Sequence, residues 1–268
     1  MRLLVCLAAF GLFCLPLFGE QTQLKAGEAF QYSLYCVQGF IPIPAGTASL
    51  SVAATNLQGG AAFALDMALD ASSVVEKVYH FRTRFRSLVT PELEPILYEK
   101  SAEEGSRFYV ETTTFTRLES GEHSVDCRRE FKEGRVETGR ETRKGRIYDL
   151  VSVCFFARSL RRSMAKGERM PVSVVSGVKV RDRTLVYSGE DAASGENGEK
   201  VSCDVFALMG DVKGDGPEKE IARFWISQDS CRIPVRIDMA LKWGSISVRL
   251  EKREFPIRHC PEADSRFP

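Results

Sequence analysis

The sequence predicts a mainly β protein: a single large curved antiparallel sheet, or half-barrel, with one long amphipathic helix packed on or in it. Most of the chain alternates apolar and polar residues with period two, which is typical of half-buried strands. Residues 148–167 are the exception, because their apolar residues recur at helical spacing. No internal repeat or low-complexity linker divides the chain. We therefore expect one β-rich domain over residues 20–256 and a C-terminal tail over residues 257–268.

Residues 1–19 have the layout of a secretory signal peptide. One basic residue precedes a mostly apolar run from Leu3 to Phe18, which is short for a membrane span, and Gly19 offers a small residue for cleavage. A lipoprotein signal is the competing interpretation, because Cys6 and Cys14 lie in this segment. Both follow bulky residues, where lipid attachment requires a small one. We therefore expect an exported, periplasmic protein without a lipid anchor.

The composition limits the class of partner. The chain has 37 basic and 36 acidic residues, for a formal net charge of +1. Nucleic-acid binding requires a clustered basic surface, so this balance excludes nucleic acid as the main partner. With 44% hydrophobic residues, the chain has ample material for a core.

Removal of the signal would leave six of the eight cysteines: Cys36, Cys127, Cys154, Cys203, Cys231 and Cys260. An even number in an exported protein suggests disulfides, and six cysteines allow 15 pairings. The alternative is that several are buried small hydrophobic residues, which fits Cys154 on the apolar face of the helix. A disulfide would tether Cys260, which lies in the tail.

The part of the chain before the helix is predicted to be a series of strands joined by short turns. An ambiguous segment from Ser72 to Leu88 is interpreted as a helical turn at Ser72–Glu76 followed by a strand. In that strand His80, Arg82, Arg84 and Arg86 would share one face, which could form a rim but is more typical of the wet side of a sheet. The other predicted strands cover residues 30–36, 48–52, 63–69, 96–102, 107–118, 124–131 and 136–143.

Residues 117–146 alternate charges of both signs, with a turn at Glu133-Gly134. This pattern predicts a solvated, projecting hairpin whose charges resist edge-to-edge aggregation. The same hairpin could serve as a docking element for a partner.

The helix is predicted from Asp149 to Met164, with the side chain of Asp149 as N-cap and Gly167 as the residue that ends it. Its apolar stripe contains Leu150, Val153, Cys154, Ala157, Leu160 and Met164, and is widened by Phe155 and Phe156. Arg158 lies one turn from this stripe. It could pair with Glu190 or Asp229, although an exposed arginine is the simpler interpretation.

Strands resume after the helix, with two polar loops at residues 189–198 and 210–217. Trp225 alternates with Phe224 and Ile226, so we expect it to be buried in a strand covered on both faces. The predicted strands are residues 170–175, 178–187, 200–209, 221–227, 233–242 and 245–254.

The sequence contains no pattern that indicates catalysis, a metal or a cofactor. Phosphate-binding loops, the Gly-x-Ser-x-Gly elbow and the His-Glu-x-x-His motif are absent. His80, His123 and His259 lie in different segments. Residues 211–216 resemble a calcium loop only weakly, because Lys213 stands where a ligand belongs. We therefore expect a protein that is not an enzyme and that uses no cofactor or metal.

Several short motifs, in order, resemble a known family. The resemblance covers about residues 27–251 and is to the bacterial domain-of-unknown-function 3108 family. It implies an exported protein of Gram-negative bacteria with a β-rich fold and no established activity, and it carries over no catalytic residues. The cysteines and the charged hairpin are not part of the pattern. The motifs are Gly27-Glu28 before Tyr32-Ser-Leu, Ala45-Gly-Thr-Ala, Tyr98-Glu-Lys, Asp149-Leu-Val-Ser leading to Ala157-Arg-Ser-Leu, Gly189-Glu190, Phe224-Trp-Ile-Ser with Asp229, Arg232-Ile-Pro-Val-Arg, and Gly244-Ser-Ile with Leu250-Glu251.

Two functions are compatible with these observations. The first is a periplasmic, non-enzymatic binding or carrier module for a lipid or other apolar ligand, which is also compatible with peripheral membrane contact. The ligand-binding cavity would be lined by Phe155, Phe156, Leu160, Trp225 and Trp243, and the helix would act as its plug or lid. The alternative is that these side chains form a packed core without room for a guest. The second function is an envelope assembly or scaffold protein that docks a protein partner through the charged hairpin.

Overall fold

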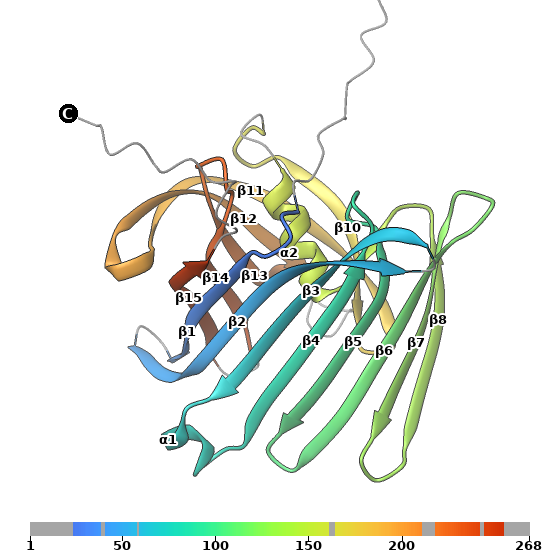
Figure 1. Cartoon of the computed structure of the whole chain (residues 1–268), viewed down its shortest axis with the longest axis horizontal. Coiled ribbons are helices and arrows are strands. Elements are labelled where there is room, and N and C mark those ends of the chain that lie inside the picture. Colours follow the sequence, from blue (N-terminus) through green and yellow to red (C-terminus); the bar gives the residue numbers. More distant parts are fainter. Residues whose placement is uncertain are drawn as a thin grey trace, which may run out of the picture.

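The computed structural model describes residues 24–38, 41–57, 59–160, 164–210, 218–241 and 244–254. Over these residues the chain forms one 15-stranded sheet with two short α-helices and a 3-10 turn (Figure 1). The predicted mainly β fold is thereby confirmed.

The elements follow one another along the chain with mostly short connections. In order they are β1 (Ala29–Gln38), β2 (Ile41–Leu57), β3 (Gly60–Ala71), α1 (Ser73–Glu76), β4 (Phe81–Val89), β5 (Pro95–Glu104), β6 (Arg107–Arg117), β7 (His123–Phe131), β8 (Val136–Arg143), β9 (Ile147–Tyr148), α2 (Leu150–Ser159), β10 (Arg169–Ser176), β11 (Lys179–Ser194), η1 (Glu196–Gly198), β12 (Lys200–Gly210), β13 (Lys219–Ser227), β14 (Pro234–Ala240) and β15 (Ser245–Glu254).

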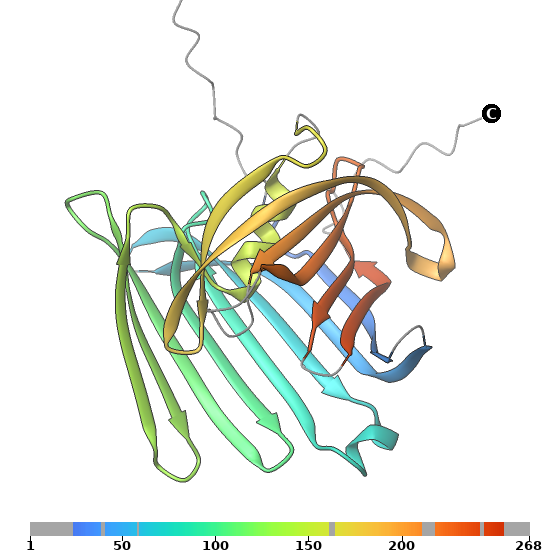
Figure 2. The same ribbon diagram turned by 180° about the vertical axis from the view of Figure 1, so that it is seen from behind.

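The sheet consists of two antiparallel meanders joined at the centre. The first meander runs from β1 to β8, the second from β10 to β15, and β1 pairs with β15. Strand β9 pairs with β10 in parallel. The sheet curls until its two ends approach each other, and it is therefore nearly closed and barrel-like rather than an open half-barrel (Figures 1 and 2).

In the part of the chain that the structure describes, side-chain contacts and not a strand ladder join the two ends of the sheet. The backbone N–H of Val180 on β11 donates to Oε1 of Glu141 on β8 (2.9 Å), and Arg143 lies 3.4 Å from Asp182. Gly139 allows the closest approach, since a Cβ there would overlap the carbonyl of Val178. We call this contact between β8 and the β10–β11 hairpin the seam.

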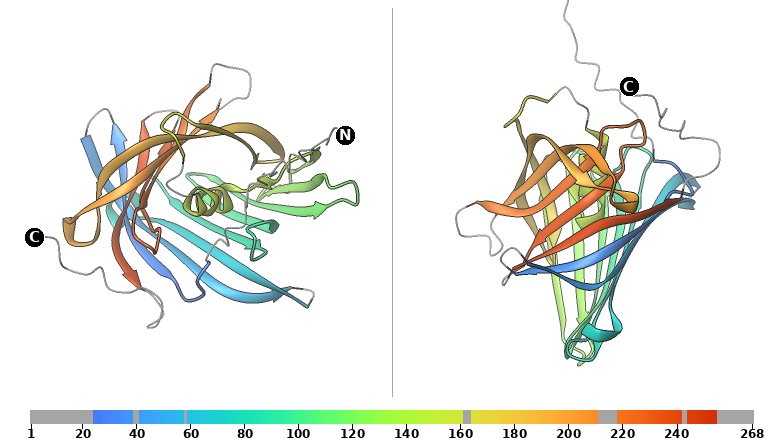
Figure 3. Two further views of the ribbon diagram at one scale, coloured as in Figure 1. Left: turned by 90° about the horizontal axis from the view of Figure 1, so that it is seen from above. Right: turned by 90° about the vertical axis from the view of Figure 1, so that its left-hand side faces the viewer.

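Helix α2 lies inside the barrel, as the view along it shows (Figure 3). The predicted N-cap is confirmed: Asp149 accepts from the backbone N–H groups of Val151 and Ser152 at 2.8 and 2.9 Å. Ser152 Oγ in turn accepts from the N–H of Asp149, which completes a capping box. Of the two arrangements predicted, on the sheet or in it, the helix takes the second.

The predicted long helix is not confirmed, because α2 is short and ends at Ser159 rather than Met164. Leu160 is extended, with φ −74° and ψ 134°. The guanidinium of Arg232 donates to the carbonyl of Leu160 at 2.6 Å, so a distant side chain takes the place of the next helical turn. Gly167 does have positive φ (89°), but in the turn before β10.

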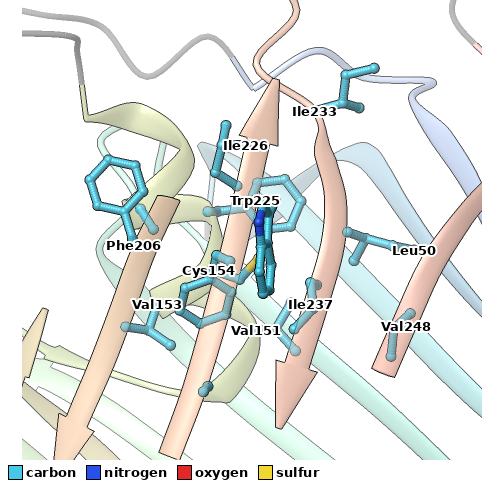
Figure 4. Close-up of a cluster of buried hydrophobic side chains, with 14 of the residues drawn as sticks. Leu50, Val151, Val153, Cys154, Phe206, Trp225, Ile226, Ile233, Ile237 and Val248 are labelled. Atoms are coloured by element: carbon cyan, nitrogen blue, oxygen red, sulfur yellow. The ribbon is translucent and has the colours of Figure 1, made fainter. Parts of the chain in front are cut away.

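The core packs around the helix, and Figure 4 shows part of this cluster. Val151, Val153 and Cys154 of α2 are at most 2% exposed and pack against inward-facing residues of both meanders. Phe206, Ile226, Ile233, Ile237, Leu50 and Val248 belong to the same cluster. The helix lies inside the core, so its apolar residues extend beyond a single stripe along one face.

Two local predictions have opposite outcomes. The ambiguous segment forms a helical turn, α1, followed by strand β4, as expected, and Arg84 and Arg86 are exposed and pair with Asp70 and Asp66 on the outer, wet face. The charged segment does form a hairpin, β7–β8, but not a projecting one. It is part of the barrel wall, because its inward-facing charges contact neighbouring strands.

Candidate functional site

The candidate site is an apolar crevice under the N-terminal end of α2. It is a cavity of about 30 Å³, lined almost wholly by apolar groups from α2 and both meanders. A volume of this size holds about one or two water molecules. The lining residues are Tyr32, Ala48, Ser49, Leu50, Met67, Leu150, Cys154, Ala222, Phe224, Ile237, Met239 and Val248.

Beyond the crevice, the apolar inner face continues to the edge of the barrel. Strand registry places Met239, Ile246, Cys36 and Ile43 side by side across four strands, β14, β15, β1 and β2. Residues directly opposite each other share a face. Met239, Ile246 and Cys36 are only partly buried, and Ile43 is 47% exposed. We call this row the mouth; it leads from the crevice into solvent.

The strands on the opposite side of the same interior, β5 to β8, carry charged residues. One row of paired positions crosses from β2 to β8 as Leu50, Met67, Phe85, Lys100, Glu111, Arg129 and Glu137. Its first three members are apolar and its last four alternate in charge. The interior is therefore amphipathic, with an apolar side at β1–β3 and β13–β15 and a polar side at β5–β8.

Internal contacts satisfy the charges of the polar side. Arg129 donates two hydrogen bonds to Glu111 at 2.8 and 2.5 Å. Lys100 donates to Tyr109 Oη at 2.7 Å and lies 4.9 Å from the centre of that ring. Desolvation lowers the pKa of Lys100, against the attraction of Glu111. Burial, together with Glu104, raises the pKa of Tyr109.

Two buried ion pairs close the other end of the barrel. Arg158 is buried and pairs with Glu28, which corrects both expectations for it: it is neither exposed nor paired with Glu190 or Asp229. Arg232 pairs with Asp204, which also accepts from Tyr187 and Gln228. Burial is the largest single effect and alone would raise the pKa of Asp204, but the hydrogen bonds from Arg232, Gln228 and Tyr187 and the charge of Arg232 together lower that pKa.

Of the predicted ligand-lining residues, Phe155, Phe156 and Leu160 do not line the crevice. Phe155 is fully buried in the core, and Phe156 stacks on Tyr148 with ring centres 4.8 Å apart. Leu160 is the C-cap of α2. Trp243 lies outside the described residues. A ligand contact of these four residues stays a prediction.

Trp225 is buried, as predicted, but it alternates with the crevice residue Phe224 and so lies on the other face of β13. Its Nε1 donates to Asp191 at 3.2 Å, and the guanidinium of Arg236 lies 4.4 Å from its ring. The crevice residues Met67 and Met239 were missed because nothing local marks them. Their positions follow from strand registry.

Cys36, Cys127, Cys154 and Cys203 are free thiols. Cys154 is fully buried on α2, which agrees with the interpretation as a small hydrophobic residue. Cys231 is buried. Cys260 lies outside the described residues, so a disulfide and the tether predicted for the tail stay predictions.

Among the described residues, no three His, Cys, Asp or Glu side chains gather in a way that could hold a metal ion. In the same part of the chain, no helix has the length and apolar character needed to cross a membrane. The signal peptide predicted for residues 1–19 lies outside the described residues.

Fold and site together define a barrel-like β protein with an internal helix and an amphipathic interior. The family model described as "Protein of unknown function (DUF3108)" matches residues 31–251, and the chain belongs to this family, as its motifs predicted. No curated protein matches the chain. Its fold is similar to the crystal structure of a beta-barrel-like protein of domain of unknown function DUF1849 from Brucella abortus. That match has a TM-score of 0.52 and 11% sequence identity, and it covers 87% of this chain and 98% of the other.

Proposed function

We propose that this protein is an exported, non-enzymatic binding protein that takes the acyl chain of an amphipathic molecule at the mouth of its barrel. The observation that carries the proposal is the continuous apolar track from the crevice to the exposed Ile43, through Met239, Ile246 and Cys36. An apolar inner face left open to water is costly, and a guest that covers it would be favoured.

The crevice itself is too small for a chain, so binding requires adjustment at its entrance. Met67 and Met239 line the crevice and are only partly buried. Methionine side chains are unbranched and adaptable, so they can turn aside at low cost. Leu150, at the first turn of α2, forms the inner limit of the space that they would open.

The charged residues of the row that crosses from β2 to β8 could bind the polar head group of such a ligand. Lys100 on β5 and Arg129 on β7 belong to the polar side and donate hydrogen bonds to Tyr109 and Glu111. A polar head group could replace Tyr109 at Lys100 without leaving a buried charge unpaired, because Tyr109 is neutral and still donates to Glu104 at 3.1 Å.

A fluorescent fatty acid, 11-(dansylamino)undecanoic acid, tests the proposal by titration. The variant M239K places a charge on the track at a partly exposed position, and V110K is its matched control on an exposed outer position of β6. We expect M239K to bind at least about tenfold more weakly, or 1.4 kcal/mol, and V110K to bind like wild type. The proposal would be overturned if M239K and V110K bound the fatty acid with equal affinity. It would also be overturned if the wild type bound no fatty acid and mass spectra showed no co-purified lipid.

A further inference from the structure

Exposed apolar side chains are concentrated at the end of the barrel where the mouth lies. Six of the nine exposed large hydrophobic residues in the described part of the chain lie there: Ile41, Ile43, Val74, Val78, Tyr79 and Leu241. The other three are Val110, Leu118 and Val136. Val74 and Val78 are the most exposed of all in relative terms, at 73% and 89%.

Helix α1 and the start of β2 are neighbours at this end (Figure 1). The N–H of Ser72 donates to the carbonyl of Ala45 at 2.7 Å, two residues along β2 from Ile43. Leu241 follows β14, whose last residue pairs with Ser245, which in turn pairs with Val37 at the end of β1. The exposed residues therefore border the mouth instead of being scattered.

The tip at α1 is held in a fixed position. Val75 points inward and packs against the core, which turns Val74 and Val78 outward. The Tyr79 ring rests on Gly105 in the β5–β6 turn, and His80 bridges Glu76 and Glu103. Exposure of Val74 and Val78 is thus a property of a folded, anchored turn.

We propose that this end of the barrel, with α1 as its tip, contacts the surface of a lipid bilayer. Two valines on a convex single turn are too few for a specific protein interface, which buries roughly 800 Å² on each partner. They suit shallow insertion among lipid chains, with the amphipathic ring of Tyr79 at the level of the head groups. The exposed Lys77 beside them can extend its ammonium group towards lipid phosphates.

The apolar track adds a second reason for a bilayer as the occupant. Ile41 and Ile43 pair with Gln38 and Cys36, so they continue the inner face of the mouth outward. A bilayer at this end would cover the exposed rim and the open inner face together, whereas a folded protein would have to match both a protruding turn and a hollow. This contact does not depend on whether the barrel binds a ligand.

Vesicle flotation tests the contact, with full-length protein and vesicles of phosphatidylcholine and phosphatidylglycerol. The variant V74D/V78D places charges on the tip, and L118D is the matched control at an exposed residue in the β6–β7 turn, at the opposite end. We expect wild type and L118D to float with vesicles and V74D/V78D to partition at least tenfold less.

Two further measurements keep the outcomes distinct. Gel filtration without vesicles should show the same oligomeric state for all three proteins, and the dansyl fatty acid titration should be unchanged in V74D/V78D. Equal flotation of all three proteins, no flotation of wild type, or an oligomeric state altered only by V74D/V78D would overturn the membrane contact. Loss of fatty acid binding in M239K with normal flotation would separate this contact from ligand binding.

Discussion

Arg158 of α2 and Glu28, just before β1, form a two-pronged ion pair with nitrogen–oxygen distances of 2.7 and 2.6 Å. Their side chains are 6% and 0% exposed. Arg158 also donates to the carbonyl of Cys231 at 2.9 Å. One guanidinium therefore joins the internal helix, the entry to the first strand and the loop before β14, and fixes the C-terminal half of α2 inside the barrel.

Removal of one partner of this pair should destabilise the protein strongly. Glu28→Ala leaves the guanidinium of Arg158 buried without its carboxylate, which costs about 3–5 kcal/mol in the free energy of unfolding. The double variant Glu28→Leu/Arg158→Met, which removes both charges, should lose less than Glu28→Ala. Urea unfolding followed by circular dichroism measures both. A loss below about 1 kcal/mol in Glu28→Ala would contradict the structural role of the pair.

The cap of α2 should be a second point of stability. Asp149 accepts from two backbone N–H groups and from the hydroxyl of Ser87 at 2.6 Å. Asp149→Ala removes the acceptor for all of them and should cost about 2–4 kcal/mol, since loss of a cap is compounded by unpaired buried donors. Asp149→Asn keeps an acceptor oxygen and should cost less. If both variants unfold at the same urea concentration, hydrogen bonding at this cap is not what stabilises the helix.

The anchor of α1 should depend on pH. The hydrogen bonds that the His80 ring donates to the carboxylate of Glu103, and then to that of Glu76, raise the pKa of His80. A raised pKa in the folded state means that the stabilisation is fully present below the unfolded value of about 6.5 and is lost as pH rises through the folded value. Titration of the His80 ring by NMR should give a pKa above about 6.5, and Glu103→Gln should lower it. Amide exchange in residues 73–80 should quicken over the same pH interval.

Much of this structure could be predicted from local patterns. Period-two alternation located most strands, and the helical turn before β4 and the cap at Asp149 depend on residues close together in sequence. The end of α2 could not be predicted, because it is set by Arg232, 72 residues from Leu160. The same holds for Arg158 and Glu28, which are 130 residues apart. The apolar mouth depends on the registry of β1 with β15, which no local pattern specifies.

The free cysteines should differ sharply in reactivity. Burial raises the pKa of the Cys154 and Cys203 thiols to about 12, and the thiolate is the reactive form. Cys36 is partly exposed at the mouth. N-ethylmaleimide at about pH 8 should modify Cys36 first in the native protein and reach Cys154 only after unfolding, as peptide mass spectrometry would show. Equal rates for Cys36 and Cys154 would mean that α2 leaves the barrel readily.

The seam between β8 and the β10–β11 hairpin should be the weakest part of the barrel wall, because side chains close it. Gly139→Val inserts a side chain where a Cβ would already overlap the carbonyl of Val178. The two edges must then separate, which breaks the hydrogen bond from Val180 to Glu141 and exposes the small cluster of Val125, Cys127, Ile147, Val175 and Val180. Overpacking of this kind costs about 1–3 kcal/mol.

Hydrogen exchange distinguishes a loosened seam from general destabilisation. In Gly139→Val the amide of Val180 should lose protection, while amides in the β1–β15 ladder keep theirs, since those strands pair by backbone hydrogen bonds. Thr138→Val is the matched control, because Thr138 is the exposed neighbour on β8. Loss of protection of equal size at Val180 and in the β1–β15 ladder would show that the barrel opens as a whole and not at the seam.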